Sequence, residues 1–209
     1  VGGSVAGLAT AVGLQPNRTV CVLEKAKEFR NIGALISLFP NGITALGALS
    51  PDLKNRVLRN CVNLQSTVTI NAEDGSLVRE EKARETTNSC FLLWYQLQQE
   101  LLATLSDETV VKLGCTFQTA SQEEPGELVR VTFGDAISGK NGTLTCRVLV
   151  GADGIYSRVR DYCLGDENKK RMLPPLRFHN RTIFRGILPV EDGGFVTSSL
   201  LSPPLGTAV

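Results

Sequence analysis

The sequence has little of what marks a metal site, a membrane span or a nucleic-acid partner. It contains one histidine, His179, and its six cysteines form no CxxC pair, which excludes the clustered ligands of a zinc site. Its apolar runs are interrupted and fall short of the roughly 20 residues that span a bilayer. Lys and Arg number 22 against 21 Asp and Glu, without a basic stripe, so nucleic acid is not expected as a partner.

The overall composition is that of a folded domain. Hydrophobic residues make up 42% and charged residues 21% of the 209 positions, which excludes extended disorder. Cys21 and Cys146 lie in apolar, strand-like runs, where a thiol behaves as a small hydrophobic side chain. We therefore expect reduced, buried cysteines and an intracellular protein, cytoplasmic or organellar, whose compartment the sequence leaves unknown.

Both ends of the sequence are unusual. It begins at Val1, inside a glycine motif, and ends at Val209 after a Pro-Pro-Leu-Gly run. We expect a fragment that lacks a few N-terminal residues and a large C-terminal portion. Its central sheet would then expose an edge, which is a liability for aggregation.

The opening residues predict a βαβ unit. Residues 4–14 are small and apolar, as in a helix buried against a sheet, and residues 19–24 (TVCVLE) form a β-branched run typical of a covered parallel strand. Further strands are predicted at 62–70, 75–79, 109–120, 127–134, 143–150 and 181–188, and helices at 91–105 and from residue 155. A short helix is predicted after the turn at Pro40, and a linker at 168–175.

Two features of that unit point to a nucleotide. Gly2 and Gly7 match the outer glycines of GxGxxG, with Ser4 at the middle one, and the motif brings a pyrophosphate to a helix N-terminus. A glycine-rich turn that only packs a helix closely is the alternative. Glu24 ends the next strand, about 20 residues after Gly2. At this position of a dinucleotide-binding fold, an acidic side chain accepts a hydrogen bond from a ribose hydroxyl and disfavours a 2′-phosphate. FAD or NAD is therefore favoured over NADP, although Glu24 is also readable as a surface acid closing a strand.

A third motif, GADGIYSRVR at 151–160, follows the apolar run VLV and starts a helix. A DG turn with Ser157 and Arg160 at the helix start would account for part of it. Together with GGSVAGLATA, VLEKA and GALISLFPNGITALGAL, it resembles the FAD-dependent monooxygenases of the aromatic-ring hydroxylase (p-hydroxybenzoate hydroxylase-like) class.

The resemblance implies a fold and a division into domains. The fold is α/β: a Rossmann-like FAD-binding (βαβ) domain with a β-meander, interrupted by an antiparallel-sheet substrate domain and truncated at both ends. It assigns residues 1–60 and 90–165 to the FAD-binding domain, and residues 61–89 and 176–209 to part of the substrate-binding domain.

The resemblance also implies a set of cofactor-binding residues. Gly2 to Gly7 would hold the FAD pyrophosphate, Glu24 the adenosine ribose, and Arg30 the phosphate side, and Lys25, next to Glu24, belongs to the set without a more specific role. Phe117 would meet the adenine through its backbone, and Asp153 would contribute to FAD and NAD(P)H binding, while Ser157 and Arg160 stabilise its loop. The complete set is Gly2, Gly3, Ser4, Val5, Ala6, Gly7, Glu24, Lys25, Arg30, Phe117 and Asp153.

The sequence departs from the family at three points. Ser4 replaces a glycine. Trp94 stands where many members carry an arginine that contacts FAD. Either Gln98 or Arg30 replaces this arginine contact, or the contact is absent. The family's later Gly-Asp motif has no counterpart, which leaves half a flavin site and an inactive fragment.

The activity implied is that of an NAD(P)H-using monooxygenase. Through a flavin C4a-hydroperoxide it would hydroxylate or epoxidise a small aromatic or isoprenoid substrate with O₂. The catalytic residues are unknown: Tyr95, Tyr156 and Arg185 are candidates near a substrate cavity, and His179 reads as structural. The alternatives are a flavin reductase or halogenase of the same superfamily, and a non-catalytic nucleotide-binding fragment. Oligomeric state stays unknown.

Overall fold

The computed structural model describes residues 1–62, 66–71, 73–82, 90–122, 126, 128–172, 183–189 and 195–201, with side chains up to Gly165. The chain folds into two compact units, which are described separately: Val1–Asn31 with Leu101–His179, and Ile32–Glu100 with Asn180–Val209. Among the described residues, the domain boundaries predicted from the sequence differ from this division at 32–60 and 90–100, and they stay a prediction.

The first unit begins with the predicted helix and strand. α1 (Val5–Leu14) buries Leu8, Ala11 and Val12. β1 (Cys21–Leu23) pairs in parallel with β6 (Val110–Lys112), and the pairing is limited to these three residues on each strand. The predicted strand at 19–24 is therefore present but shorter: residues 21–23 pair in register with β6, and Val20 and Glu24 each add one backbone hydrogen bond to β6 at the ends.

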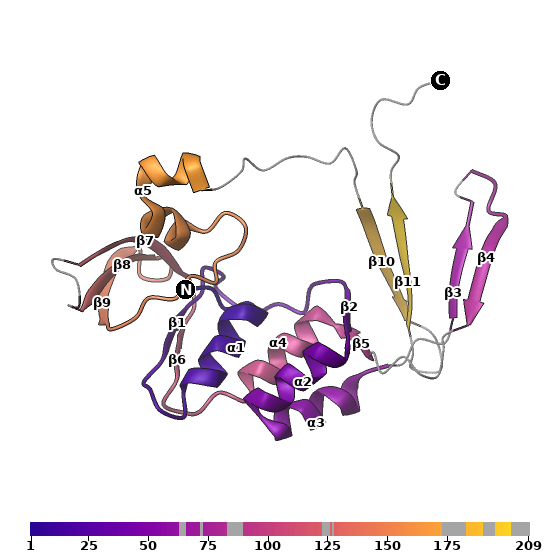
Figure 1. Ribbon diagram of the computed structural model, residues 1–209, viewed down its shortest axis with the longest axis horizontal. Coiled ribbons are helices and arrows are strands. Elements are labelled where there is room, and N and C mark those ends of the chain that lie inside the picture. Colours follow the sequence, from indigo (N-terminus) through magenta and orange to yellow (C-terminus); the bar gives the residue numbers. More distant parts are fainter. Residues whose placement is uncertain are drawn as a thin grey trace. The chain divides into compact units, whose positions relative to one another are not determined.

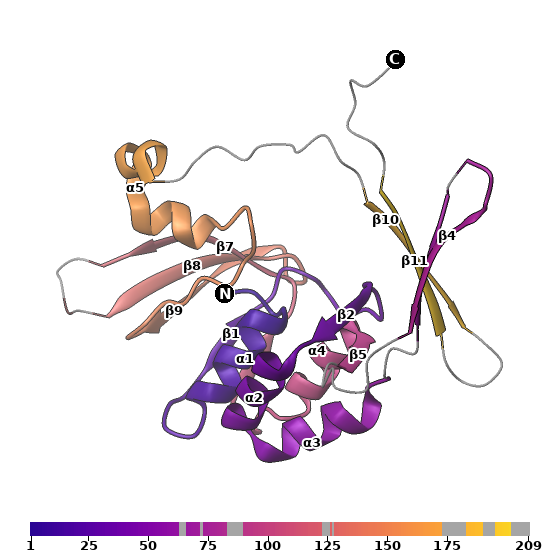
Figure 2. The same cartoon turned by 45° about the vertical axis from the view of Figure 1, so that its right-hand side comes forward.

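A three-stranded antiparallel meander completes the first unit. It consists of β7 (Cys115–Ser121), β8 (Val129–Asp135) and β9 (Lys140–Cys146), in that order, and α5 (Arg158–Met172) lies beside it (Figures 1 and 2). The core of the unit consists of Leu23, Cys115, Phe117, Ala120, Val131, Phe133 and Val159. The strand predicted at 143–150 ends at Cys146, so the apolar residues that follow it are not part of the sheet.

The second unit contains α2 (Pro40–Leu49), α3 (Pro51–Asn60) and an antiparallel pair of β2 (Leu35–Leu38) with β5 (Cys90–Leu93). α4 (Trp94–Leu102) starts directly after β5. The helix predicted at 91–105 is therefore wrong for 91–93, because these residues pair with β2 instead of continuing the leucine spacing of the helix.

Two antiparallel hairpins also belong to this unit. β3 (Ser66–Ile70) pairs with β4 (Leu77–Lys82), and β10 (Ile183–Pro189) with β11 (Phe195–Leu201). All residues of β3 and β4 are exposed. The mixed α/β class with antiparallel sheets is thus confirmed.

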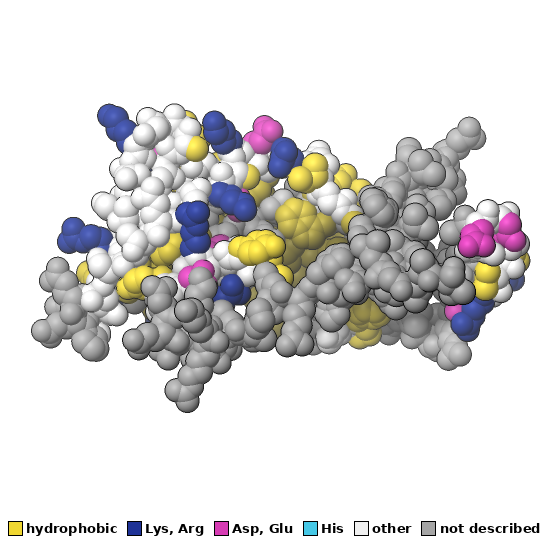
Figure 3. All heavy atoms as spheres, turned by 90° about the horizontal axis from the view of Figure 1, so that it is seen from above, with side chains coloured by type: hydrophobic (Ala, Val, Ile, Leu, Met, Phe, Trp, Pro, Cys, Tyr) yellow, Lys and Arg dark blue, Asp and Glu magenta, His cyan; other side chains and the backbone are white. Residues whose placement is uncertain are grey.

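The surface mixes apolar and charged side chains. Val148 and Tyr156 are among the exposed large hydrophobic residues, at 72% and 78% of full exposure. On the face shown in Figure 3, Lys and Arg side chains are dispersed among acidic and apolar ones. None of the helices in the described part of the chain is long and apolar enough to cross a bilayer.

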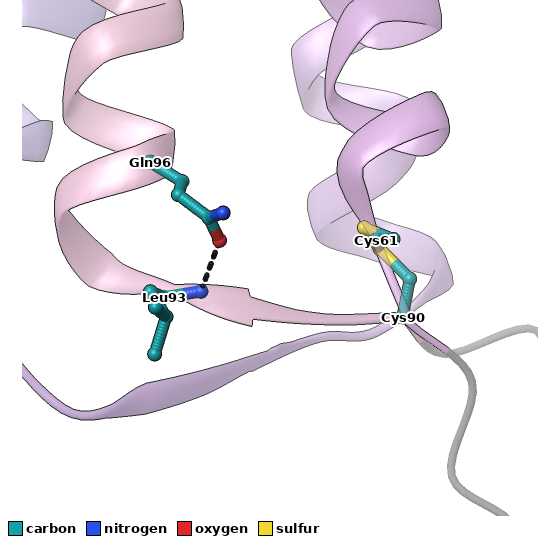
Figure 4. Close-up of a disulfide and its surroundings, with 4 residues drawn as sticks. All are labelled: Cys61, Cys90, Leu93 and Gln96. Carbon is teal, nitrogen blue, oxygen red and sulfur yellow. Dashed lines mark hydrogen bonds between the residues drawn. A yellow bond between two sulfur atoms is a disulfide. The ribbon is translucent and has the colours of Figure 1, made fainter. Parts of the chain in front are cut away.

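The cysteines differ from expectation in two ways: one pair is oxidised, and Cys21 and Cys163 are exposed where burial was expected. Cys61, directly after α3, forms a disulfide with Cys90, the first residue of β5, and their Cα atoms are 5.4 Å apart (Figure 4). The expectation of reduced cysteines is wrong for this pair. The neighbouring bridge between Val62 and Phe91 explains the proximity, since it draws two segments 29 residues apart together. Cys21, Cys115, Cys146 and Cys163 are free.

Candidate functional site

The glycine turn, residues 2–4, leads into α1 and is hydrogen-bonded to the end of β1. The Gly2 N–H donates to the Leu23 carbonyl at 2.8 Å. Its φ of 103° lies in the region that side chains disfavour, and a Cβ there would lie 2.3 Å from the Ala152 carbonyl oxygen. Gly2 therefore lets two loops, one before α1 and one before α5, meet at their backbones.

The N-terminus of α1 lies close to this turn. A Cβ on Gly7 would come within 1.8 Å of the Gly2 carbonyl oxygen. The N-cap residue, Ser4, makes no side-chain cap hydrogen bond among the described residues, and the first turn carries no acidic side chain. The first amides of a helix have no intrahelical acceptor, and together with the helix dipole they favour an anion. This end of α1 is thus open to a phosphate and is not neutralised by a carboxylate of its own.

Glu24 fixes the turn from the end of β1. One carboxylate oxygen accepts from the Gly3 N–H at 2.6 Å, and the other accepts from the Ala26 N–H at 2.7 Å. The side chain is partly buried, and its Cβ lies 2.9 Å from where a Cβ on Gly3 would be. Since each oxygen keeps a second lone pair, the carboxylate can hold the turn and still accept from a hydroxyl.

Asp153 organises the loop between Ala152 and α5. Its carboxylate accepts from the Ser157 hydroxyl, from the Arg158 N–H at 2.7 Å and from the Val159 N–H at 3.3 Å. Although burial raises the pKa of Asp153, these hydrogen bonds outweigh burial and hold it below its ordinary value. Asp153 thereby caps the N-terminus of α5.

Ser157 and Arg160 stabilise this loop, as predicted. The Arg160 N–H donates to the Ser157 hydroxyl oxygen at 3.0 Å, and the Arg160 guanidinium donates to the Ile155 carbonyl at 2.8 Å. Because this network is built from the loop's own residues, it accounts for the serine and the arginine of the motif without a ligand.

Replacing Asp153 by Ala should lower the free energy of unfolding by about 1 kcal/mol at neutral pH, as for loss of a helix N-cap. Because the pKa is lower in the folded state, the stabilisation by the carboxylate is fully present above the unfolded pKa of about 4. It is lost as the pH falls through the folded value. The stability difference between the wild type and D153A, measured by urea unfolding, should therefore shrink below about pH 4.

The control is Asp107→Ala, which removes an exposed carboxylate from a turn of the same unit. D107A should stay within about 0.5 kcal/mol of the wild type. A D153A difference that grows on acidification would contradict the capping role.

The other predicted cofactor-binding residues, Lys25, Arg30 and Phe117, do not take part in the hydrogen bonds of the glycine turn. Lys25 and Arg30 are exposed, and the hydrogen bonds that join Gly2, Gly3 and Glu24 involve neither. Phe117 is a buried core residue of β7. Its predicted backbone contact with the adenine stays a prediction, as does the assignment of every cofactor-binding residue.

The remaining residues singled out in the sequence lie in different parts of the chain. Trp94 and Tyr95 begin α4, in the second unit, and Tyr156 is exposed in the loop before α5. Gln98 is buried. His179 and the side chain of Arg185 lie outside the described residues.

The sequence reading missed Ala152 and Arg158. The Ala152 carbonyl oxygen lies where a Gly2 side chain would be, and the Arg158 guanidinium donates to the Phe117 carbonyl at 3.4 Å. Contacts through a backbone carbonyl leave no trace in residue type. The signal available was indirect: both residues belong to the GADGIYSRVR motif.

Known proteins similar to this chain are flavin enzymes. It is 28% identical over 203 residues to the FAD-dependent monooxygenase pigN of Monascus ruber, over 91% of this chain and 44% of that protein. It is 30% identical over 197 residues to the 3-amino-4-hydroxybenzoate 2-monooxygenase PtnB3 of Streptomyces platensis, over 91% and 46%. No family model matches the chain.

The fold agrees with these relatives. It superimposes on the crystal structure of the flavin-dependent monooxygenase PieE in complex with FAD and substrate with a TM-score of 0.67, at 17% identity, over 89% of this chain and 32% of that one. The chain spans less than half the length of the curated relatives named above. The resemblance predicted from the motifs is confirmed: the chain is homologous to FAD-dependent monooxygenases.

Proposed function

We propose that the chain belongs to an FAD-dependent monooxygenase and that its first unit binds the ADP moiety of FAD. One observation carries the proposal: hydrogen bonds from Gly2 to Leu23 and from Gly3 to the Glu24 carboxylate bring the glycine turn, the end of β1 and the uncapped N-terminus of α1 together. In this proposal β1, α1 and the glycine turn belong to a Rossmann-like unit, and the substrate-binding part is the antiparallel portion of the chain.

The residues present fit the cofactor. A Cβ on Gly2 would collide with the Ala152 carbonyl, and a Cβ on Gly7 with the Gly2 carbonyl. The two glycines thus supply the tight turn and the close helix packing that a dinucleotide-binding turn requires. The Ser4 hydroxyl, which makes no cap hydrogen bond within the described residues, is free to donate to a phosphate oxygen. Glu24 would accept from the adenosine ribose, and Asp153 would order the loop that faces Gly2.

The bound flavin would supply the redox and oxygen chemistry, while the chain's residues bind and orient it. The names of the relatives include 3-amino-4-hydroxybenzoate and 6-methylsalicylate monooxygenases, which supports a small aromatic substrate over an isoprenoid one. The same names favour a monooxygenase over a reductase or halogenase. Reduction by NAD(P)H and the oxygen-transfer mechanism expected from the resemblance stay predictions.

A charge at the N-cap of α1 tests the cofactor site. Ser4→Asp should weaken FAD binding at least about tenfold, because a carboxylate would compete with the pyrophosphate for the same amides. Yet the substitution should leave the free energy of unfolding unchanged or higher, since Asp is a good N-cap. FAD affinity is measured by flavin fluorescence titration, and stability by thermal unfolding without the cofactor.

The matched control is Ser50→Asp at the N-cap of α3, where the Ser50 hydroxyl already accepts from the Leu53 N–H at 3.2 Å. S50D should resemble S4D in stability and the wild type in FAD affinity. Equal FAD affinities for S4D and the wild type would refute a pyrophosphate site at α1, and a wild-type chain that binds no FAD would refute the proposed function.

A further inference from the structure

The Cys61–Cys90 disulfide closes off one segment of the second unit. Cys61 directly follows α3, Cys90 is the first residue of β5, and the two are 29 positions apart in the sequence (Figure 4). The β3–β4 hairpin lies between them, and every residue of its two strands is exposed. The disulfide therefore joins the two ends of residues 62–89, the hairpin segment, whose described strands bury none of their side chains.

A short backbone bridge is the other connection between these two ends. The Val62 N–H donates to the Phe91 carbonyl at 2.8 Å, and the Phe91 N–H donates to the Val62 carbonyl at 2.9 Å. Val62 is 37% exposed, so water competes for both hydrogen bonds. Weakly protected backbone of this kind opens locally, without unfolding the rest of a protein. Without the disulfide, we expect the base of the hairpin segment to behave in this way.

The elements beside the disulfide are held by contacts of their own. Arg56 and Asn60 of α3 donate to the two carboxylate oxygens of Glu100 in α4, each at 2.7 Å. The start of α4 is capped by the Gln96 side chain, which accepts from the Leu93 N–H at 2.8 Å (Figure 4). α3 and α4 thus stay joined when the disulfide is broken, and the opening is confined to the base of the hairpin segment.

The two sulfur atoms differ in their access to solvent. Cys90 is 4% exposed, whereas Cys61 is half-buried and lies next to exposed Val62. Thiol–disulfide exchange begins with a thiolate attacking one of the two sulfurs, and its rate depends on access to that sulfur. The Cys61 sulfur is therefore the one open to attack.

The rest of the chain does not rely on disulfides. Cys21 and Cys163 are exposed and free, whereas domains that use disulfides in place of a core pair most of their cysteines. The elements that the disulfide joins have a buried core, since Leu53 and Val57 of α3 and Leu92 of β5 are 0% exposed. The fold around the pair is thus expected to persist when the pair is reduced.

We propose that Cys61–Cys90 is a reversible exchange site for a small thiol of the glutathione type, and that its reduction opens the base of the hairpin segment. A glutathione thiolate attacks the Cys61 sulfur, the bond to the Cys90 sulfur breaks, and Cys90 leaves as a thiolate that takes up a proton. A second glutathione thiolate attacks the glutathione sulfur of this mixed disulfide and releases Cys61 and glutathione disulfide. Two electrons thus pass from two glutathione molecules to the pair.

The consequence for activity rests on the proposed function, in which the hairpin belongs to the substrate-binding part. The oxidised pair would hold that part in place, and reduction would loosen it. The exchange itself uses no flavin, so its tests are run without FAD. Their failure would leave the ADP site of the first unit untouched, and a chain that binds no FAD would leave the exchange site untouched.

The first experiment titrates the full chain with buffers of increasing ratio of reduced to oxidised glutathione, without denaturant. Free thiols are blocked with N-ethylmaleimide and located by peptide mass spectrometry, and backbone opening is followed by hydrogen–deuterium exchange. Cys61 and Cys90 should become alkylated together, and glutathione disulfide should restore the pair. Exchange in β5 should be at least tenfold faster in the reduced chain, while exchange in α3 stays unchanged.

Three results of this titration would overturn the proposal. They are a pair that is reduced only in denaturant, equal β5 exchange in the two states, and faster exchange of α3 together with β5. The last would make the disulfide a support of the whole unit. Cys163→Ser, which removes an exposed free thiol, is the control and should behave as the wild type.

The second experiment tests which sulfur is attacked. Cys90→Ser leaves Cys61 as a free thiol, and Cys61→Ser leaves Cys90. With glutathione disulfide, the adduct on Cys61 in C90S should form at least tenfold faster than the adduct on Cys90 in C61S. Equal or reversed rates would overturn the assignment of Cys61. The wild-type titration decides the rest of the proposal without either variant, should one of them fail to fold.

Discussion

Replacing Gly7 by Ala should lower the free energy of unfolding by about 3 kcal/mol, the upper end of the usual cost of overpacking. The added Cβ would lie 1.8 Å from the Gly2 carbonyl oxygen, which is backbone and has no rotamer by which to withdraw. α1, which contacts β1 and whose Leu8, Ala11 and Val12 are buried, would have to move away from the glycine turn. The measurement is urea unfolding followed by far-UV circular dichroism.

The opposite result is expected at a glycine of similar helical position. In α2, a Cβ on Gly42 would meet only the Leu38 side chain, at an ordinary 3.7 Å. Gly42→Ala should therefore stabilise the protein by up to about 1 kcal/mol, the usual helix-propensity gain. If G7A behaved like G42A, the close approach of α1 to the turn would be disproved.

The sequence predicted the parts of the site that depend on residue type. A turn with φ near 103° and a helix packed on a carbonyl both require glycine, so Gly2 and Gly7 were visible as a motif. Glu24 was visible because it ends a β-branched run, and Asp153 because it lies in a motif with Ser157.

Other features depend on partners far away in the chain, and local pattern could not show them. Phe91–Leu93 continue a helical leucine spacing but lie in a strand, because β2 pairs with them. The Cys61–Cys90 disulfide depends on the same region, where the Val62 bridge to Phe91 brings α3 to β5. Residues 147–150 have the apolar sequence of a strand, but forming a strand also requires a neighbouring strand to pair with.

Glu24 combines two interpretations that the sequence kept apart. It was read as either a ribose ligand or an acid closing a strand. The structure shows its carboxylate accepting from Gly3 and Ala26, so it stabilises the turn whether or not a nucleotide is bound. Its proposed role toward the ribose therefore needs a readout that turn stability alone would not change.

Glu24→Ala should lower the free energy of unfolding by about 2 kcal/mol, since two partly buried amides lose a charged acceptor. Glu24→Gln should lose about half as much, because its one amide oxygen can accept from a single N–H at a time in this geometry. Glu28→Ala, an exposed acid in the same loop, should stay within about 0.5 kcal/mol of the wild type. Urea unfolding of the three variants measures these differences.

The ribose contact is isolated by comparing ADP with 2′,3′-dideoxy-ADP as ligands. If Glu24 accepts from a ribose hydroxyl, the wild type should prefer ADP by about tenfold, which corresponds to one charge-assisted hydrogen bond. E24Q should show a smaller preference for ADP over 2′,3′-dideoxy-ADP. A general loss of affinity in E24Q would not produce this result, because it affects both ligands equally: they share the phosphates and the adenine. An unchanged preference in E24Q would leave Glu24 with the turn alone, and the selection of the ribose would then rest on other groups of the site.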